Sequence, residues 1–383
     1  MMKKFLPALL LAAASATGFA AAPGIPAPPA VQATGYILLD HDSGRVLAEQ
    51  RADDRMEPAS ITKLMSAYIV FAALKEKRLT LAETVKVSEY AWRKGGAVTD
   101  GSTSFLELGS QVPVEALIQG MIVQSGNDAT IALAERIGGT EDAFVQIMND
   151  YVKRLGMKGT NYMNSWGGPG PNHYSTPRDI AILSNALIRD FPEYYKWYSQ
   201  REFTWNNHRQ QNRNGLLTKD PSVDGIKTGH TDSAKYCLVS SAKRNGMRLV
   251  SVVLGSPSIK AREDASEALL QYGYNNFETV KLQEAGVAVL TPKVYKGEAD
   301  KVAIGGRSSI SVTVTRGSTG NISKEAAVNG TVIAPVQKGQ VLGQYTVRIG
   351  DEVVARVPLV ALTAVAEGGL WRTAVDTVKL WFD

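Results

Sequence analysis

The chain has 383 residues, of which 44% are apolar, enough for a sizeable core and more typical of two domains than of one. Its formal net charge of +5 is weak and spread over the sequence, whereas nucleic-acid binding usually needs a concentrated basic patch, so no nucleic-acid partner is expected. Cys237 is the single cysteine, which excludes an internal disulfide. Together with four scattered histidines it forms no metal-ligand cluster, so neither a metal nor another cofactor is expected.

The N-terminus has the pattern of a secretory signal. Lys3-Lys4 supplies positive charge, residues 5–14 are apolar, and small residues follow, with Gly18-Phe19-Ala20-Ala21-Ala22 as the cleavage region. Cleavage is expected after Ala20 or Ala21, which makes residues 1–21 a signal peptide. The alternative, an anchor that stays attached, is disfavoured because the apolar run is too short to span a bilayer. The mature protein is therefore expected outside the cytoplasm, in the periplasm.

Residues 30–286 predict an α+β domain with helices on an antiparallel sheet. The turn Asp42-Ser43-Gly44 and the dipeptide Asn245-Gly246 each join two strand-like runs. The order is strands, then many helices, then strands and a helix, which is not a βαβ repeat. The expected strands are 34–40, 45–49, 223–230, 236–242 and 248–254, and the expected helices are 60–77, 113–137, 141–155, 177–189 and 258–272.

Two further segments follow this domain. Residues 287–366 alternate apolar and polar side chains between glycine turns, as in Ile310-Ser311-Val312-Thr313-Val314, and predict a small all-β domain without a cluster of chemical groups. Residues 367–383 predict an amphipathic helix with Trp371 and Trp381 on its apolar side, which favours an in-plane membrane anchor. The alternatives are docking on its own domain or on the second subunit of a homodimer.

Ser60 and Lys63 form a Ser-x-x-Lys motif at the start of an expected helix. Residues three apart lie on one face of a helix, so the hydroxyl and the amine can touch. An amine inside an otherwise apolar helix loses hydration, which lowers its pKa and lets it take the proton from a serine nucleophile. On these residues alone, a helix cap beside a solvated lysine would be the better interpretation.

Two later motifs change that balance. Ser125-Gly126-Asn127 supplies, in one turn, a hydroxyl that can pass a proton and an amide that can hold both a lysine and a substrate carbonyl. Lys227, Thr228 and Gly229 lie on an expected strand whose edge can pair with an extended peptide, with the first two binding a terminal carboxylate and the glycine allowing close approach. Three such motifs in this order are typical of penicillin-binding proteins and class A β-lactamases.

The chain closely resembles the low-molecular-mass penicillin-binding proteins, D-alanyl-D-alanine carboxypeptidases of types 5 and 6, over nearly its whole length. The stretches that carry the resemblance are 58–65 (PASITKLM), 124–129 (QSGNDA), 211–217 (QNRNGLL) and 223–231 (VDGIKTGHT). The resemblance implies a β-lactamase/transpeptidase-like catalytic domain. It also implies removal of the terminal D-alanine from peptidoglycan pentapeptides, acylation by β-lactams, and attachment to the outer face of the cytoplasmic membrane.

The same resemblance implies roles for individual residues. Ser60 would attack the substrate carbonyl with Lys63 as base, and Ser125 and Lys227 would deliver a proton as D-alanine leaves. The backbone N–H groups of Ser60 and His230 would form the oxyanion hole. Water would then release the acyl-enzyme, whereas β-lactams would acylate Ser60 and deacylate slowly.

Arg213 and Arg262 are, by the same resemblance, candidates to bind the substrate carboxylate. The alternative for each is an ordinary structural ion pair.

One loop departs from the family pattern. The family carries His-Gly-Leu-Asp where this chain has Trp166-Gly167-Gly168-Pro169, which leaves the rigidity of the loop and the deacylation rate open. A class A β-lactamase is disfavoured, because no Glu-x-x-Leu-Asn pattern lies between Ser125 and Lys227. Two more functions compatible with the motifs are an inactive wall-binding protein and an endopeptidase acting on D-alanine cross-links.

Overall fold

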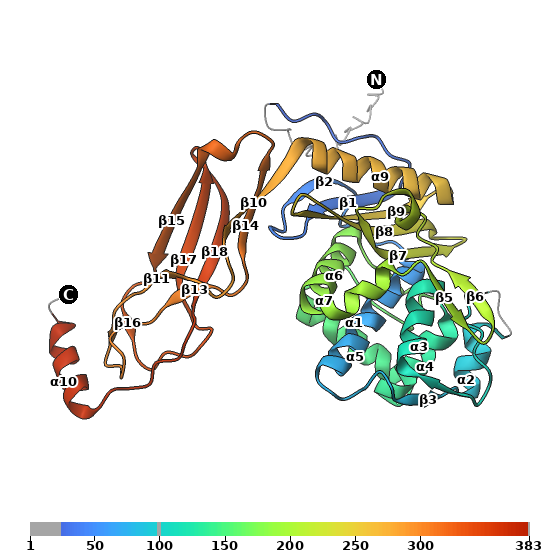
Figure 1. Ribbon diagram of the computed structural model, residues 1–383, viewed down its shortest axis with the longest axis horizontal. Coiled ribbons are helices and arrows are strands. Elements are labelled where there is room, and N and C mark those ends of the chain that lie inside the picture. Colours follow the sequence, from blue (N-terminus) through green and yellow to red (C-terminus); the bar gives the residue numbers. More distant parts are fainter. Residues whose placement is uncertain (1–23, 98–100, 382–383) are drawn as a thin grey trace, which may run out of the picture.

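The computed structural model describes residues 24–97 and 101–381, so the expected signal peptide (1–21) lies outside the described residues. Figure 1 shows a larger body of helices and strands beside an elongated body of strands, joined at the end of the long helix α9 (Ile259–Asn276). The α+β class and the C-terminal β domain expected from the sequence are confirmed.

A five-stranded antiparallel sheet is the centre of the larger domain, in the order β2-β1-β9-β8-β7. β7 therefore forms one edge of the sheet, as the sequence predicts. The strands are β1 (Gly35–Asp40), β2 (Val46–Gln50), β7 (Val223–Thr231), β8 (Lys235–Arg244) and β9 (Met247–Ser256).

The two faces of this sheet bury two different hydrophobic clusters. Along β1, Tyr36 and Leu38 pack in the cluster under α9, whereas Ile37 and Leu39 pack in the larger cluster of the helical layer. Successive side chains of a strand point to opposite faces, so this one strand serves both layers. Figure 1 shows α9 covering one face, with α1 and α6 on the other.

The helical layer holds most of the helices expected from the sequence. Its helices are α1 (Lys63–Lys75), α2 (Glu89–Trp92), α3 (Val114–Gln119), α4 (Asn127–Gly138), α5 (Glu141–Leu155), α6 (Pro177–Asp190), α7 (Pro192–Tyr195) and α8 (Leu216–Lys219). Two two-stranded antiparallel sheets lie at its margin: β3 (Thr84–Lys86) with β4 (Gln111–Pro113), and the hairpin of β5 (Glu202–Trp205) with β6 (His208–Gln211). Within α1 only Lys75 is not buried, which explains why apolar residues cover more than one face of that segment.

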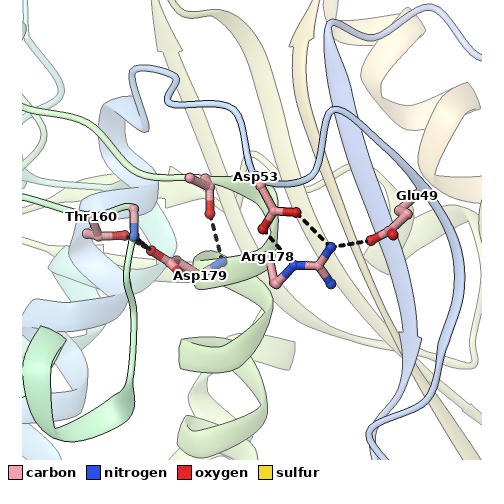
Figure 2. A network of polar contacts seen from close by, with 7 residues as sticks. Glu49, Asp53, Thr160, Arg178 and Asp179 are labelled. Atoms are coloured by element: carbon pink, nitrogen blue, oxygen red, sulfur yellow. Dashed lines mark hydrogen bonds and ion pairs between the residues drawn. The ribbon is translucent and has the colours of Figure 1, made fainter. Parts of the chain in front are cut away.

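The loop that leads from β2 to the Ser-x-x-Lys motif is fixed to the N-terminus of α6. Figure 2 shows Arg178 between two carboxylates: its Nη2 donates to Glu49 Oε2 at 2.6 Å and its Nε to Asp53 Oδ1 at 2.7 Å. Further along the loop, Met56 and Ser175 exchange backbone hydrogen bonds of 2.8 and 2.9 Å. The nucleophile segment is thus anchored before it enters the core.

The smaller domain is built around a five-stranded sheet in the order β11-β13-β18-β17-β15, with the two-stranded pairs β10-β14 and β12-β16 beside it. Val294, Ile304, Val312, Val347 and Leu359 are among its buried core. The predicted domain boundary at 286/287 stays a prediction. The strands are β10 (Phe277–Gln283), β11 (Ala288–Leu290), β12 (Val294–Tyr295), β13 (Ile304–Gly306), β14 (Ile310–Thr315), β15 (Ile322–Val328), β16 (Val332–Ile333), β17 (Val341–Ile349) and β18 (Glu352–Ala361).

Polar contacts join the two domains at the turn between β1 and β2. Ser43 Oγ and Thr313 Oγ1 lie 2.6 Å apart, and Arg45 Nη1 donates to Thr313 O at 2.6 Å. Thr279 Oγ1 donates to Asp40 Oδ2 at 2.6 Å. These contacts hold β10 and β14 against the edge of the larger domain.

Helix α10 (Leu370–Lys379) lies at the end of the β domain that is far from the larger domain (Figure 1). It begins three residues later than expected from the sequence, because Glu367 forms an isolated bridge with Gly297. Its Asp376 accepts a hydrogen bond from the backbone N–H of Lys296 at 2.8 Å. Across residues 24–97 and 101–381, no helix is both long and apolar enough to cross a membrane.

We expect Leu249→Ala to lower the free energy of unfolding by about 2–5 kcal/mol. Leu249 is fully buried between β9 and α9, where its Cδ1 would lie 2.5 Å from a Cβ placed on Gly273, so truncation leaves a cavity. The control is Leu108→Ala at a leucine with 53% exposure, which should change stability by less than about 0.5 kcal/mol. Urea unfolding followed by circular dichroism measures both, and equal effects would contradict the assigned packing.

Candidate active site

Ser60 lies in a 3₁₀ turn (Ala59–Thr62) rather than in the first turn of α1. The turn begins where Ile61 N–H donates to Pro58 O at 3.1 Å, and α1 starts only at Lys63. Ser60 is half-buried, whereas Lys63 is 1% exposed. The expected contact is present, because Lys63 Nζ lies 3.0 Å from Ser60 Oγ.

The Lys63 amine is also held by two carbonyl oxygens. Nζ donates to Asn127 Oδ1 at 2.7 Å and to the backbone oxygen of Trp166 at 2.6 Å. A neutral amine has two hydrogens, and these two acceptors take both. Its lone pair is then free to face Ser60 Oγ, which is the arrangement of a base beside a nucleophile.

Burial lowers the pKa of Lys63 well below its ordinary value, because an ammonium ion loses its hydration there. The positive charge of Arg213 lowers this pKa further, while Asp128 and Glu141 raise it. Burial likewise lowers the pKa of Lys227, with the charge of Lys63 as the next cause. Both lysines therefore lose a proton more readily than lysines in water.

The second motif interrupts the helical stretch expected over 113–137. Ser125 has a positive φ of 67° and separates a π-helical turn (Gly120–Gln124) from α4, which begins at Asn127. The Ser125 side chain is 2% exposed, and its Oγ has no hydrogen-bond partner among the described residues. A buried hydroxyl left without a partner beside a cavity is available to a ligand.

The third motif lies on the edge strand β7. Lys227 and Thr228 are buried, and Lys227 Nζ donates to Thr228 O at 3.2 Å. A Cβ on Gly229 would lie 3.0 Å from Pro58 O and 3.3 Å from Ala59 Cβ. This glycine therefore lets β7 approach the turn that carries Ser60, in addition to leaving room for a substrate.

A cavity of about 790 Å³ opens between these elements. The sequence-predicted residues that line it are Ser60, Ser125, Asn127, Arg213, Thr228, Gly229, His230 and Arg262. Lys63 and Lys227 lie buried behind this lining. The fold thus brings all ten predicted site residues to one place, although they are spread from residue 60 to residue 262.

The two arginines of the cavity are not paired with a carboxylate within the part of the chain that the structure describes. Arg262 is 5% exposed, and its guanidinium donates only to backbone oxygens, those of Gly229 and Cys237 at 3.4 Å and of Arg213 at 3.3 Å. These are long contacts for a charged group, and Nε has no hydrogen-bond partner in the described part of the chain. The arrangement favours binding of an anionic ligand over a structural ion pair.

In residues 24–97 and 101–381, no three His, Cys, Asp or Glu side chains are placed to hold a metal. Cys237 is buried on β8, as expected.

Comparison with known proteins identifies the family. Residues 22–258 match the family model described as D-alanyl-D-alanine carboxypeptidase, and residues 277–367 match that of the penicillin-binding protein 5 C-terminal domain. The chain belongs to the D-alanyl-D-alanine carboxypeptidase family. It is 42% identical over 361 residues to D-alanyl-D-alanine carboxypeptidase DacA of Escherichia coli. The aligned region covers 94% of this chain and 90% of that protein.

Solved structures agree with this assignment. Penicillin-binding protein 5 of Haemophilus influenzae superposes with a TM-score of 0.80 at 42% identity, covering 89% of this chain and 99% of the other. Penicillin-binding protein D2 of Listeria monocytogenes, in its ampicillin-bound form, has a TM-score of 0.56 at 30% identity, covering 64% of this chain and 98% of the other. The predicted family, fold and enzyme class are thereby confirmed: the chain is a serine-type D-Ala-D-Ala carboxypeptidase.

The loop where this carboxypeptidase departs from the family pattern contributes directly to the site. Asn164 Oδ1 accepts hydrogen bonds from the backbone of Gly167 and Gly168 at 2.7 and 2.8 Å, which folds the loop on itself. The Trp166 carbonyl then points to Lys63. Sequence reasoning noted the loop but missed this acceptor; the paired glycines were the signal, because they indicate close backbone packing.

We expect Gly167→Ala to slow acylation of this carboxypeptidase by a fluorescent penicillin by about tenfold or more. The position has a φ of +94°, and a Cβ there would lie 1.9 Å from Ala59 O, so the loop and the Ser60 turn must separate. The control is Gly170→Ala, where the nearest atom would lie 3.9 Å away. An unchanged acylation rate in Gly167→Ala would contradict the proposed packing.

Proposed function

We propose that this carboxypeptidase removes the terminal D-alanine from peptidoglycan pentapeptides through an acyl-enzyme on Ser60. The single observation that carries the proposal is the buried amine of Lys63, 3.0 Å from Ser60 Oγ and held by two carbonyl oxygens. A solvated lysine would be protonated at neutral pH and could not accept a proton. Desolvation supplies the base that the reaction needs.

In acylation, Ser60 Oγ forms a bond to the carbonyl carbon of the D-Ala-D-Ala peptide while its proton passes to Lys63 Nζ. The carbonyl oxygen takes up negative charge, and we assign the N–H groups of Ser60 and His230 to stabilise it. The C–N bond then breaks, and the proton held by Lys63 passes through Ser125 to the amine of the leaving D-alanine, with assistance from Lys227, which returns Lys63 to its neutral form. The Ser125 hydroxyl is free for this transfer, because it has no hydrogen-bond partner among the described residues.

Substrate binding in this proposal uses the free edge of β7. An extended peptide pairs with the strand beside Thr228 and Gly229, and its terminal carboxylate meets the cationic end of the cavity. Arg213 and Arg262 line that cavity without a carboxylate partner among the described residues, and Lys227 lies just behind the lining. Asn127 holds Lys63 through Oδ1, which leaves its amide nitrogen for a substrate carbonyl.

The second half of the reaction is hydrolysis of the acyl-enzyme. Water attacks the ester carbonyl, Lys63 accepts its proton, and Ser60 Oγ regains a proton as it leaves. A β-lactam enters by the same acylation but keeps its leaving group attached, so the adduct persists. The ampicillin-bound form of the Listeria neighbour supports β-lactams as ligands of this chain.

Ser60→Ala should abolish both D-alanine release from a pentapeptide and covalent labelling by penicillin, because no other group replaces the nucleophile. The measurements are an amino-acid oxidase assay for D-alanine and mass spectrometry of the labelled protein. Ser199→Ala, at an exposed serine outside the cavity, is the control and should keep both activities. If Ser60→Ala still released D-alanine, the assignment of Ser60 as the nucleophile would be wrong. A cross-linked peptide dimer, assayed in parallel, tests for endopeptidase activity.

We further propose that the enzyme is exported and attached to the outer face of the cytoplasmic membrane through α10. The polar side of the helix is docked on its own domain, where Arg372 pairs with Asp300 and Asp376 is buried. Leu370 and Trp371 remain 93% and 83% exposed. Because these apolar side chains face away from the protein, they favour insertion at a bilayer interface.

Leu370→Ser should weaken binding of the mature chain to phosphatidylcholine–phosphatidylglycerol vesicles in a flotation assay. The polar side of α10 contacts the protein's own β domain, so membrane binding comes from burial of the apolar side chains. Binding should therefore depend little on the salt concentration. The control is Leu108→Ser, at an exposed leucine of the other domain. If Leu370→Ser instead changed the sedimentation of the vesicle-free protein, the helix would cover a second copy of the chain, and membrane attachment would be wrong.

A further inference from the structure

Glu141 is a buried carboxylate that none of the steps above uses. It is the first residue of α5 and is 6% exposed, but it does not line the cavity. A buried carboxylate must be compensated by hydrogen bonds or charges, so its partners show what it holds in place.

The carboxylate of Glu141 accepts hydrogen bonds through both of its oxygens. Oε1 accepts from the backbone N–H of Ser165 at 2.9 Å and from Ser165 Oγ at 2.6 Å, while Oε2 accepts from Tyr90 Oη at 2.7 Å. The N-terminus of α5, capped by Thr140, also favours a negative charge at this position. Both carboxylate oxygens are therefore occupied, and Ser165 is held twice.

Ser165 is the residue before Trp166, whose carbonyl accepts from Lys63. Ser165 O in turn accepts from Ser66 Oγ at 2.5 Å, so the residue is tied to α1 on one side and to α5 on the other. Lys63 and Ser66 lie on the same face of α1, one turn apart. A shift of Ser165 would therefore move the acceptor of the Lys63 amine.

We propose that Glu141 is a positioning residue of the carboxypeptidase reaction: through Ser165 it fixes the Trp166 carbonyl that aims the Lys63 amine at Ser60, and its negative charge acts on that amine. The proposal rests on the assignment of Lys63 as base made above. It also accounts for how the loop at 166–169 can be ordered although it lacks the family's His-Gly-Leu-Asp sequence, because its order comes from α5 and from Asn164.

The charged groups around Lys63 determine the direction in which Glu141 shifts the pKa of the Lys63 amine. Besides burial, the charge of Arg213 lowers the pKa of Lys63, whereas Asp128 and Glu141 favour the protonated amine and raise that pKa. Lys227 also faces this group, since the charge of Lys63 lowers the pKa of Lys227. Removing the charge of Glu141 therefore lowers the pKa of Lys63, and the neutral base persists to lower pH.

The groups that face Glu141 itself are Tyr90 on α2 and Ser165 in the loop. Burial and the hydrogen bond to Glu141 raise the pKa of Tyr90, and the nearby carboxylates Asp142 and Glu135 act in the same direction. The phenol thus stays protonated and keeps donating to Glu141 across the working pH range.

The test measures the second-order acylation rate with a fluorescent penicillin from acid to alkaline pH. The rate falls on the acid side of this profile, the acid limb, because Lys63 becomes protonated. Glu141→Gln keeps an oxygen for Ser165 but removes the charge, so the pH at the midpoint of the acid limb should decrease by about half a unit. Glu141→Ala also removes the acceptor, and the maximal rate should fall about tenfold to a hundredfold, with the affinity for intact penicillin little changed.

The matched control is Asp179→Asn. Asp179 (Figure 2) is likewise a buried carboxylate near a helix N-terminus, and it accepts from Gly159 N and Thr160 Oγ1 at 2.7 Å each. The Lys63 amine makes its hydrogen bonds to Ser60, Asn127 and Trp166 instead. This variant should leave the midpoint of the acid limb where it is. Thermal unfolding of each variant, with and without bound penicillin, reports whether the fold is kept.

An acid limb that Glu141→Gln leaves in place, or one that Asp179→Asn moves equally, would overturn the role of Glu141. The Glu141→Gln result tests this role even if Glu141→Ala fails to fold.

A wrong assignment of Lys63 as the base would give a different result. Lys63→Met would then keep the wild-type acylation rate, or the wild-type enzyme would show no acid limb.

Discussion

The burial of one amine is the constraint on which the rest of this enzyme depends. Lys63 can act as a base only if water is kept from it, and water is excluded because the amine emerges from α1, a helix buried on almost every side. A desolvated amine must still satisfy its hydrogens. Asn127 and the Trp166 carbonyl do so from two other parts of the chain, and this leaves the Ser60 side of the amine for chemistry.

Close backbone packing brings these parts within reach of one another. Gly229 lets the edge strand β7 lie against the turn of Ser60, and Gly167 lets the Trp166 loop lie against the same turn from another direction. A Cβ would clash with the Ser60 turn at Gly167 and would be crowded against it at Gly229. The nucleophile therefore sits where three segments meet with little side-chain volume between them, which restricts the movement of the reacting groups.

The arrangement of the domains suits an enzyme that works on an extended substrate near a surface. Asp40, Ser43 and Arg45 hold the β domain against the catalytic domain, and α10 lies at the far end of that β domain (Figure 1). Docking α10 through Asp376 uses its polar side and leaves its apolar side uncovered. The cavity is thus held at a distance from the proposed point of attachment.

The sequence by itself determined the three motifs, the edge position of β7, the division into an α+β and a β domain, and the identity of the ten candidate site residues. The motifs, the edge strand and the division into domains follow from local pattern and spacing, which act over a few residues, whereas His230, Arg213 and Arg262 follow from the family resemblance. Only the tertiary structure decided that Ser60 precedes α1 in a 3₁₀ turn, that the Trp166 carbonyl accepts a hydrogen bond from Lys63, and that Glu141 binds the neighbouring residue Ser165. The glycines after Trp166 indicate close backbone packing, but a backbone acceptor carries no signature of its own partner. Contacts between residues a hundred positions apart depend on how the helices pack, so no local pattern identifies which groups meet.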